Sequence, residues 1–157
     1  MFAGFSRRHR FTLAVLVIPL FLAGCSLGGK GASGTVPKDI EDTVYRFYDA
    51  LFKGDLDSLK QTVSGTMATD LPRIAGPYVH YALLNPEGAK ATKAEIKSAR
   101  MVAAQSDQWA VVDVLVVAST PYQNETAYGA FSHRLHLWNF GDGWRIYYSE
   151  EAGAIVP

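Results

Sequence analysis

Apolar residues recur every three or four positions between residues 37 and 53, and this spacing predicts an amphipathic helix. The apolar face consists of Ile40, Val44, Phe47, Tyr48, Leu51 and Phe52. The first turn carries acids, which suit the positive end of a helix dipole. Gly54 ends this helix, and Asp55 caps a short second helix that closes at Gly65.

Residues 66–92 hold three prolines and two glycines, which break long elements. We therefore expect only a short third helix, over residues 77–84. After Gly88 the pattern changes to period two, with β-branched and aromatic residues, as is typical of strands. The expected strands are 94–105, 109–120, 126–140 and 144–150. Helices followed by an antiparallel meander predict one α+β domain.

The alternation also assigns the strand faces. Residues expected to point inward and cover the helices are Ala110, Val112, Val114, Val116, Ala118, Phe131, His133, Leu135, Leu137, Trp144, Ile146 and Tyr148. Residues expected to point outward include Tyr128, Ser132, Arg134, His136 and Trp138. The inward set is almost wholly apolar, so the core of the domain should lie between this face and the helices.

The charges are unevenly distributed along the chain. Basic and acidic residues number 15 each, but residues 1–24 contain three arginines and no acid. The remainder therefore has 12 basic against 15 acidic residues, a net charge of −3. An apolar run at 11–22 follows the arginines, with the length of a secretory signal core and short of the roughly 20 residues that span a bilayer.

This leader ends in Leu22-Ala23-Gly24-Cys25, which resembles the lipobox of bacterial lipoproteins. The resemblance implies cleavage between Gly24 and Cys25 and lipidation of Cys25, the sole cysteine; the alternative is a buried cysteine in an uncleaved helix. Residues 1–24 would then be a signal peptide, 25–37 a lipidated tether and 38–157 the domain. Acyl chains, at roughly 0.8 kcal/mol per buried methylene, would anchor it outside the cytoplasm. The membrane would be the cell membrane, or the outer membrane facing the periplasm where one exists.

Three further motifs occur in the expected domain. They are Lys53-Gly54-Asp55, Asp-Gln-Trp-Ala-Val-Val-Asp-Val at 107–114, and Leu-Trp-Asn-Phe-Gly-Asp-Gly-Trp-Arg-Ile at 137–146. Their arrangement over about residues 38–150 resembles the nuclear transport factor 2-like superfamily, and more narrowly small bacterial lipoproteins of unassigned function that carry this domain. The resemblance implies helices in the concave face of a curved antiparallel sheet, a cone with a pocket at its open end. Members include ketosteroid isomerases, polyketide cyclases, dehydratases and non-catalytic assembly modules, so the fold assigns no function.

Isomerase-like members use an aspartate base and an acidic hydroxyl donor inside the cone. Asp113 is the only acid within the strand core, but its position in the alternation points it outward, toward Arg134. His133 points inward, where a neutral imidazole can move a proton or donate to a main-chain carbonyl. The residues expected around the pocket are Tyr48, Phe52, His80, Tyr81, His133 and Trp144.

The outward face combines aromatic residues with an arginine, a composition typical of protein contact surfaces. Its expected members are Trp109, Asp113, Tyr128, Arg134, His136 and Trp138. A second copy or an envelope protein would bind there, unless residues 152–157 cover it.

Other chemistry finds little support in the sequence. His133 and His136 point to opposite faces, so they share no metal, and no phosphate loop indicates a cofactor. A formal net charge of zero argues against nucleic acid as a partner. We expect a non-catalytic binding or assembly domain. The alternatives are a small-molecule binder or isomerase that uses His133 with Tyr48, and a component of a secretion or conjugation complex.

Overall fold

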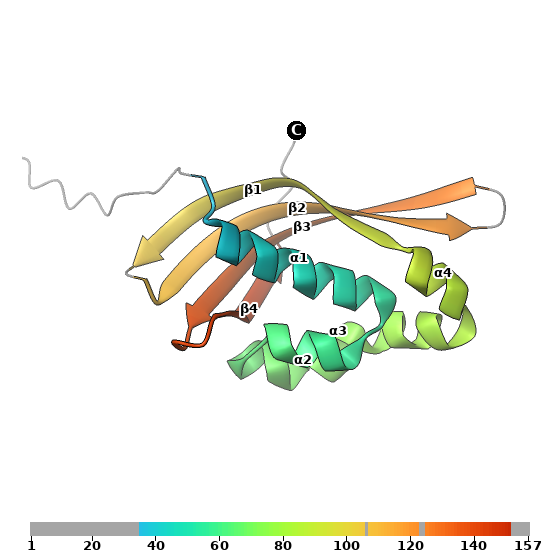
Figure 1. Cartoon of the computed structure of the whole chain (residues 1–157), viewed down its shortest axis with the longest axis horizontal. Helices are drawn as coiled ribbons and strands as arrows, with labels where there is room; N and C mark the ends of the chain where they lie inside the picture. Colours follow the sequence, from blue (N-terminus) through green and yellow to red (C-terminus); the bar gives the residue numbers. More distant parts are fainter. Residues whose placement is uncertain (1–34, 106, 123–124, 152–157) are drawn as a thin grey trace, which may run out of the picture.

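A computed structural model describes residues 35–105, 107–122 and 125–151, and in them four helices lie against one face of a curved sheet (Figure 1). The helices are α1 (Lys38–Lys53), α2 (Leu56–Thr62), α3 (Gly65–Leu84) and α4 (Pro86–Ala91). The strands are β1 (Lys93–Gln105), β2 (Trp109–Tyr122), β3 (Glu125–Asn139) and β4 (Trp144–Glu151). They form one antiparallel sheet in the order β1-β2-β3-β4. The expected α+β class and meander are confirmed.

The core lies between α1 and the concave face of the sheet. The predicted apolar stripe of α1 is buried along its whole length, with Tyr48 fully buried. On the sheet side, the inward positions Val112, Val114, Leu135 and Ile146 are each fully buried. The predicted faces of β2 and of the second half of β3 are therefore confirmed.

Helix α3 differs from the expectation for this region. It is one helix of 20 residues that contains Pro72 and Pro77, where a short helix over 77–84 was predicted. Each proline removes a main-chain hydrogen bond, but both lie on the exposed side of the helix. The opposite side buries Met67, Leu71 and Ala75. Burial against the core outweighs the local effect of the prolines.

The prediction for Tyr148 is wrong because β4 contains a bulge. Tyr148 pairs with His136, whereas Ile146 pairs with Leu137, so Tyr147 is an extra residue in β4. Ile146 keeps the inward position that the alternation predicts, but the bulge turns Tyr148 to the outer face, where 44% of it is exposed. The outer face thus gains an aromatic residue.

Gly54 provides a first testable prediction, because it ends α1 in the left-handed conformation with φ 69°. A Cβ there would lie 2.8 Å from the Ala82 Cβ and 2.9 Å from the Tyr78 carbonyl oxygen. Gly54→Ala should lower the free energy of unfolding by at least about 1–2 kcal/mol. In the matched control, Gly76→Ala within α3, the Cβ meets nothing within 4 Å apart from its two chain neighbours. The helix propensity of alanine favours this change, whereas the following Pro77 opposes it, so we expect a net effect of less than about 1 kcal/mol. Urea unfolding followed by circular dichroism measures both, and equal effects would contradict the prediction.

Candidate functional site

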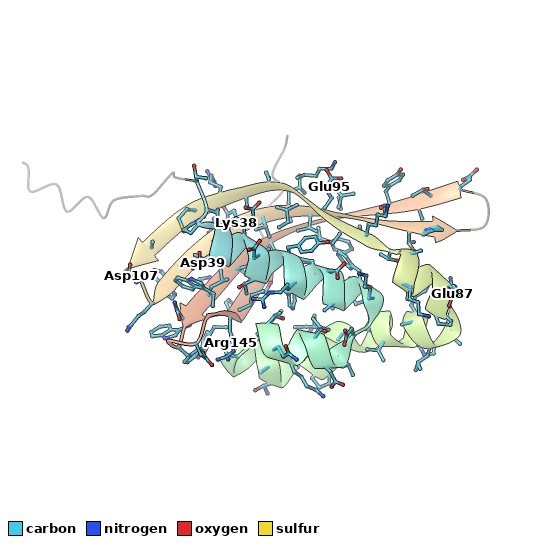
Figure 2. All side chains as sticks on the ribbon, viewed as in Figure 1. Lys38, Asp39, Glu87, Glu95, Asp107 and Arg145 are labelled. Carbon is cyan, nitrogen blue, oxygen red and sulfur yellow. The ribbon has the colours of Figure 1, made fainter. Side chains whose placement is uncertain are left out.

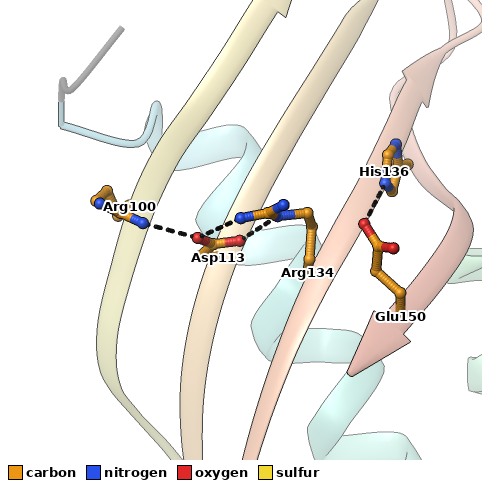
Figure 3. A network of polar contacts seen from close by, with 5 residues as sticks. All are labelled: Arg100, Asp113, Arg134, His136 and Glu150. Carbon is orange, nitrogen blue, oxygen red and sulfur yellow. Dashed lines mark hydrogen bonds and ion pairs between the residues drawn. The ribbon is translucent and has the colours of Figure 1, made fainter. Parts of the chain in front are cut away.

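The outer face of the sheet holds a buried carboxylate between two arginines (Figure 3). Strand pairing places Arg100 of β1 and Arg134 of β3 opposite Asp113 of β2. Arg134 donates from Nε to Oδ1 at 2.7 Å and from Nη2 to Oδ2 at 3.1 Å, and Arg100 donates to Oδ2 at 2.9 Å. These hydrogen bonds, that of Arg134 above all, lower the pKa of Asp113. The expected Asp113–Arg134 pair is present, and Asp113 itself is 4% exposed.

Beside this network the outer face is hollowed into a groove of about 490 Å³. The residues that line it, called here the aromatic groove, are Trp109, His136, Trp138, Phe140, Tyr147 and Tyr148. Trp138 is 41% exposed and Phe140 54% exposed. The guanidinium of Arg145 lies 5.9 Å from the Phe140 ring centre, within cation–π range. Arg145 also forms an ion pair with Asp142 at 2.7 Å, so the aromatic surface of the groove borders an arginine that is already paired within the chain.

Glu150 of β4 connects the groove to the arginine network (Figure 3). Its Oε1 lies 3.2 Å from His136 Nε2, and its main chain pairs with Arg134. The outer face therefore carries a band of side chains from β1 to β4. Its polar end consists of Arg100, Asp113, Arg134 and Glu150, and its aromatic end is the aromatic groove.

On the concave side of the sheet, the expected pair of Tyr48 and His133 is in contact. The Tyr48 hydroxyl lies 2.5 Å from His133 Nδ1. Burial raises the pKa of Tyr48 far above its ordinary value of 10.0, so this phenol is neutral. When the phenol donates, the imidazole proton is on Nε2; when it accepts, the proton is on Nδ1. His133 also borders a hollow of about 170 Å³ between α1, α3 and β4.

The other residues expected around the pocket are dispersed. Phe52 packs against Tyr48 and also lines a separate groove of about 400 Å³ with Tyr81. His80 is on the exposed side of α3. Trp144 lies near the start of α1, where its Nε1 donates to Asp39 Oδ2 at 2.9 Å. The structure therefore brings Tyr48, Phe52 and His133 together and separates His80 and Trp144 from them.

The residues expected on the outer face do not all lie at one site. Trp109, His136 and Trp138 meet in the aromatic groove, whereas Asp113 is covered by its arginines. Tyr128 is outside the groove lining and 74% exposed, near the far end of β3.

Five members of this band were not predicted on the outer face from the sequence. They are Arg100, Phe140, Tyr147, Tyr148 and Glu150. Arg100 could have been found from strand pairing, because it lies opposite Asp113 in a predicted strand. The two tyrosines depend on the β4 bulge, for which the sequence carries no local signal.

Gly24 and Cys25 lie outside the described residues. Within the described part of the chain, no helix is both long and apolar enough to cross a membrane. The same residues contain no group of three or more histidine, cysteine, aspartate or glutamate side chains placed to hold a metal ion.

Comparisons with known proteins show a similar fold in solved structures, but they give no match by sequence. No protein-family model and no curated protein matches the chain. The hub of a CaMKII from S. rosetta is 14% identical, with 77% of this chain and 99% of that chain covered, at a TM-score of 0.51. At this identity the likeness shows a shared fold alone.

Two further structures align less well. The intermembrane space region of the chloroplast protein ARC6 is 15% identical over 77% of this chain and 99% of its own, at a TM-score of 0.49. An NTF-2 like protein of unknown function from Shewanella oneidensis is 18% identical over 71% of this chain and 94% of its own, at a TM-score of 0.43. The class defined by the coordinates and the hub comparison is an α+β domain with helices inside a curved antiparallel sheet.

Asp113 provides a pH-dependent prediction. Its pKa in the folded chain is below the ordinary value of 3.8. Its contribution to stability is therefore complete above about pH 4 and is lost as the pH falls through the folded pKa. Asp113→Asn should cost about 1–3 kcal/mol at pH 7 and flatten the acid decline of the free energy of unfolding. Urea titrations at neutral and acidic pH measure this, with the exposed Asp107→Asn as control. An acid decline as steep in Asp113→Asn as in the wild type would contradict it.

Proposed function

We propose that this chain is a lipid-anchored, extracytoplasmic domain of the nuclear transport factor 2-like kind, and that it binds a partner protein without catalysing a reaction. The observation that carries the proposal is the aromatic groove on the outer face of the sheet. Aromatic residues and arginine are enriched in protein interfaces and among the residues that dominate binding energy.

The groove makes little contribution to the core. The buried core lies on the opposite face of the sheet, so Trp138, Phe140 and Tyr148 leave large apolar surfaces in water. Contiguous exposed apolar surface of this kind marks interaction sites in soluble domains. A partner that covers the groove would remove this surface from water.

The anchor rests on the leader and the lipobox-like Leu22-Ala23-Gly24-Cys25. A Gly-rich segment at 26–34 lies between Cys25 and the described residues, in which Val36 is already 7% exposed and part of the core. Gly-rich chains of this length span roughly 15–20 Å. The domain would thus stand close to the membrane surface with its sheet accessible. A component of a secretion or conjugation complex is a particular case of this function.

A second candidate is a small-molecule binder or isomerase-like enzyme. It is favoured by the Tyr48–His133 hydrogen bond of 2.5 Å beside a hollow of about 170 Å³. Such a pair can pass a proton to a bound ligand. The hollow is smaller than the 300–1,000 Å³ usual for ligand sites, and for that reason we rank this candidate second.

Lipidation is tested by expressing the full chain in a bacterium and following its fractionation. The wild type should sediment with membranes and incorporate labelled palmitate. Cys25→Ser should lose the label and keep the leader, because the acyl acceptor at the cleavage site is absent. Ser26→Ala serves as the control and should behave as the wild type. Palmitate label on Cys25→Ser would exclude Cys25 as the lipidated residue.

Partner binding is tested by purifying the anchored chain with its cross-linked neighbours from the native membrane. Trp138→Ala should weaken capture of a specific neighbour about thirtyfold, the equivalent of about 2 kcal/mol for a dominant contact. The control Tyr45→Ala removes an aromatic residue of similar exposure from α1 and should retain capture. Tyr48→Phe should also retain it, because the groove is on the other face. Loss in Tyr48→Phe with retention in Trp138→Ala would favour the second candidate.

A further inference from the structure

The first half of β3 has one edge without a strand partner among the described residues. The described part of β4 ends at Glu151, opposite His133, so its pairing with β3 is described only from His133 to Asn139, although β3 begins at Glu125. Residues 152–157, which follow β4 in the sequence, lie outside the described residues. On its other side, β3 pairs with β2 along its whole length. In the described chain, the outer edge of residues 125–132 therefore has no strand partner. Such an edge presents a row of main-chain donors and acceptors to any strand that approaches.

The other sheet edges carry features that prevent this kind of pairing. Strand β1 has two bulges, after Ile96 and after Met101, and several charged side chains. At the edge of β4, the Ser64 amide donates to the Ile146 carbonyl at 2.9 Å. Bulges, charges and covering segments are the usual protections of an edge strand.

Within the part of the chain that the structure describes, none of these protections is present at residues 126–132 of β3. Their sequence, Thr-Ala-Tyr-Gly-Ala-Phe-Ser, contains no charge and no proline. Their pairing with β2 has no register shift, so the segment is regular and extended. In this part of the sheet the β2–β3 hairpin also projects beyond β4 (Figure 1).

We propose that residues 126–132 pair with the same segment of a second copy of this chain, antiparallel about a two-fold axis at Gly129. The four-stranded sheets of the two copies then join edge to edge into one sheet. A two-fold axis requires a surface that is complementary to itself, and this segment meets that requirement.

The complementarity follows from the order of large and small residues around Gly129. Antiparallel pairing about this residue places Tyr128 opposite Ala130 and Ala127 opposite Phe131 of the second copy. Each ring thus faces a methyl group, and no two bulky side chains or like charges meet across the junction. Tyr128, which is 74% exposed in the single chain, gains a neighbour.

This surface is distinct from the aromatic groove. The groove residues of β3 and the turn that follows it begin at His136, whereas the open edge ends at Ser132. Pairing of the edges leaves the groove accessible to a partner protein. If the edge pairing is disproved, the proposed binding of a partner protein in the aromatic groove still stands, and the reverse also holds.

The test uses a chain from residue 25 that carries Cys25→Ser, which keeps every described residue and removes the only cysteine. Gly129→Cys is added, because a Cβ there meets only the Phe131 ring, at 3.2 Å and 3.4 Å. Directly opposed residues of an antiparallel pair have Cα atoms about 4.5–5.5 Å apart, within disulfide range. Mild oxidation should give a linked dimer. Thr126→Cys is the matched control, because two copies of residue 126 would lie roughly 20 Å apart.

A second measurement requires no cross-link. Sedimentation velocity of the Cys25→Ser chain should show a dimer, and Ala127→Lys should make it a monomer, because the lysine would face Phe131 of the second copy. Trp138→Ala should leave the dimer intact. A monomeric parent chain would overturn the proposal. If the amides of residues 126–132 in that monomer were protected from hydrogen exchange, this edge would be paired with another part of the same chain. Linkage of Thr126→Cys as strong as that of Gly129→Cys would also overturn it.

Discussion

The structure depends on the burial of one side of α1 in the concave face of the sheet. Eight of the 16 residues of this helix are buried, and a large apolar side chain contributes about 1.5–3 kcal/mol when fully buried. This packing requires apolar residues at nearly every inward strand position. It also explains the hydrogen bond between Tyr48 and His133, because a polar group at this depth needs a partner. Only the outer strand positions remain open to other chemistry.

The outer face carries two different arrangements of side chains. Around Asp113, two arginines from neighbouring strands satisfy one carboxylate, which ties β1, β2 and β3 together by side chains as well as by main chain. Toward the β3–β4 turn, the same face is aromatic and open. The first arrangement is satisfied within the chain, whereas the second leaves apolar surface that a binding partner can cover.

The sequence predicted those features that depend on local periodicity. The stripe of α1, the inward face of β2 and the pairing of Asp113 with Arg134 all follow from spacing and are present. Helix α3 could not be predicted, because its prolines are tolerated only through packing against distant residues. Tyr148 could not be placed, because one extra residue in β4 reverses the alternation after it. The aromatic groove combines both cases, since Trp109 and Trp138 follow the alternation and Tyr148 does not.

The contact between Trp144 and Asp39 has a consequence for orientation at a bilayer. It holds the start of α1 beside the β3–β4 turn, and Figure 2 shows Asp39, Asp107 and Arg145 toward one end of the molecule and Glu87 at the other. With the lipid on Cys25, the first end would be proximal to the membrane and α4 distal. Trp138 and Phe140 would then lie within a tether length of the headgroups. A protein that reaches them would itself reside at the membrane, whereas the distal hairpin would meet neighbours well clear of the lipid.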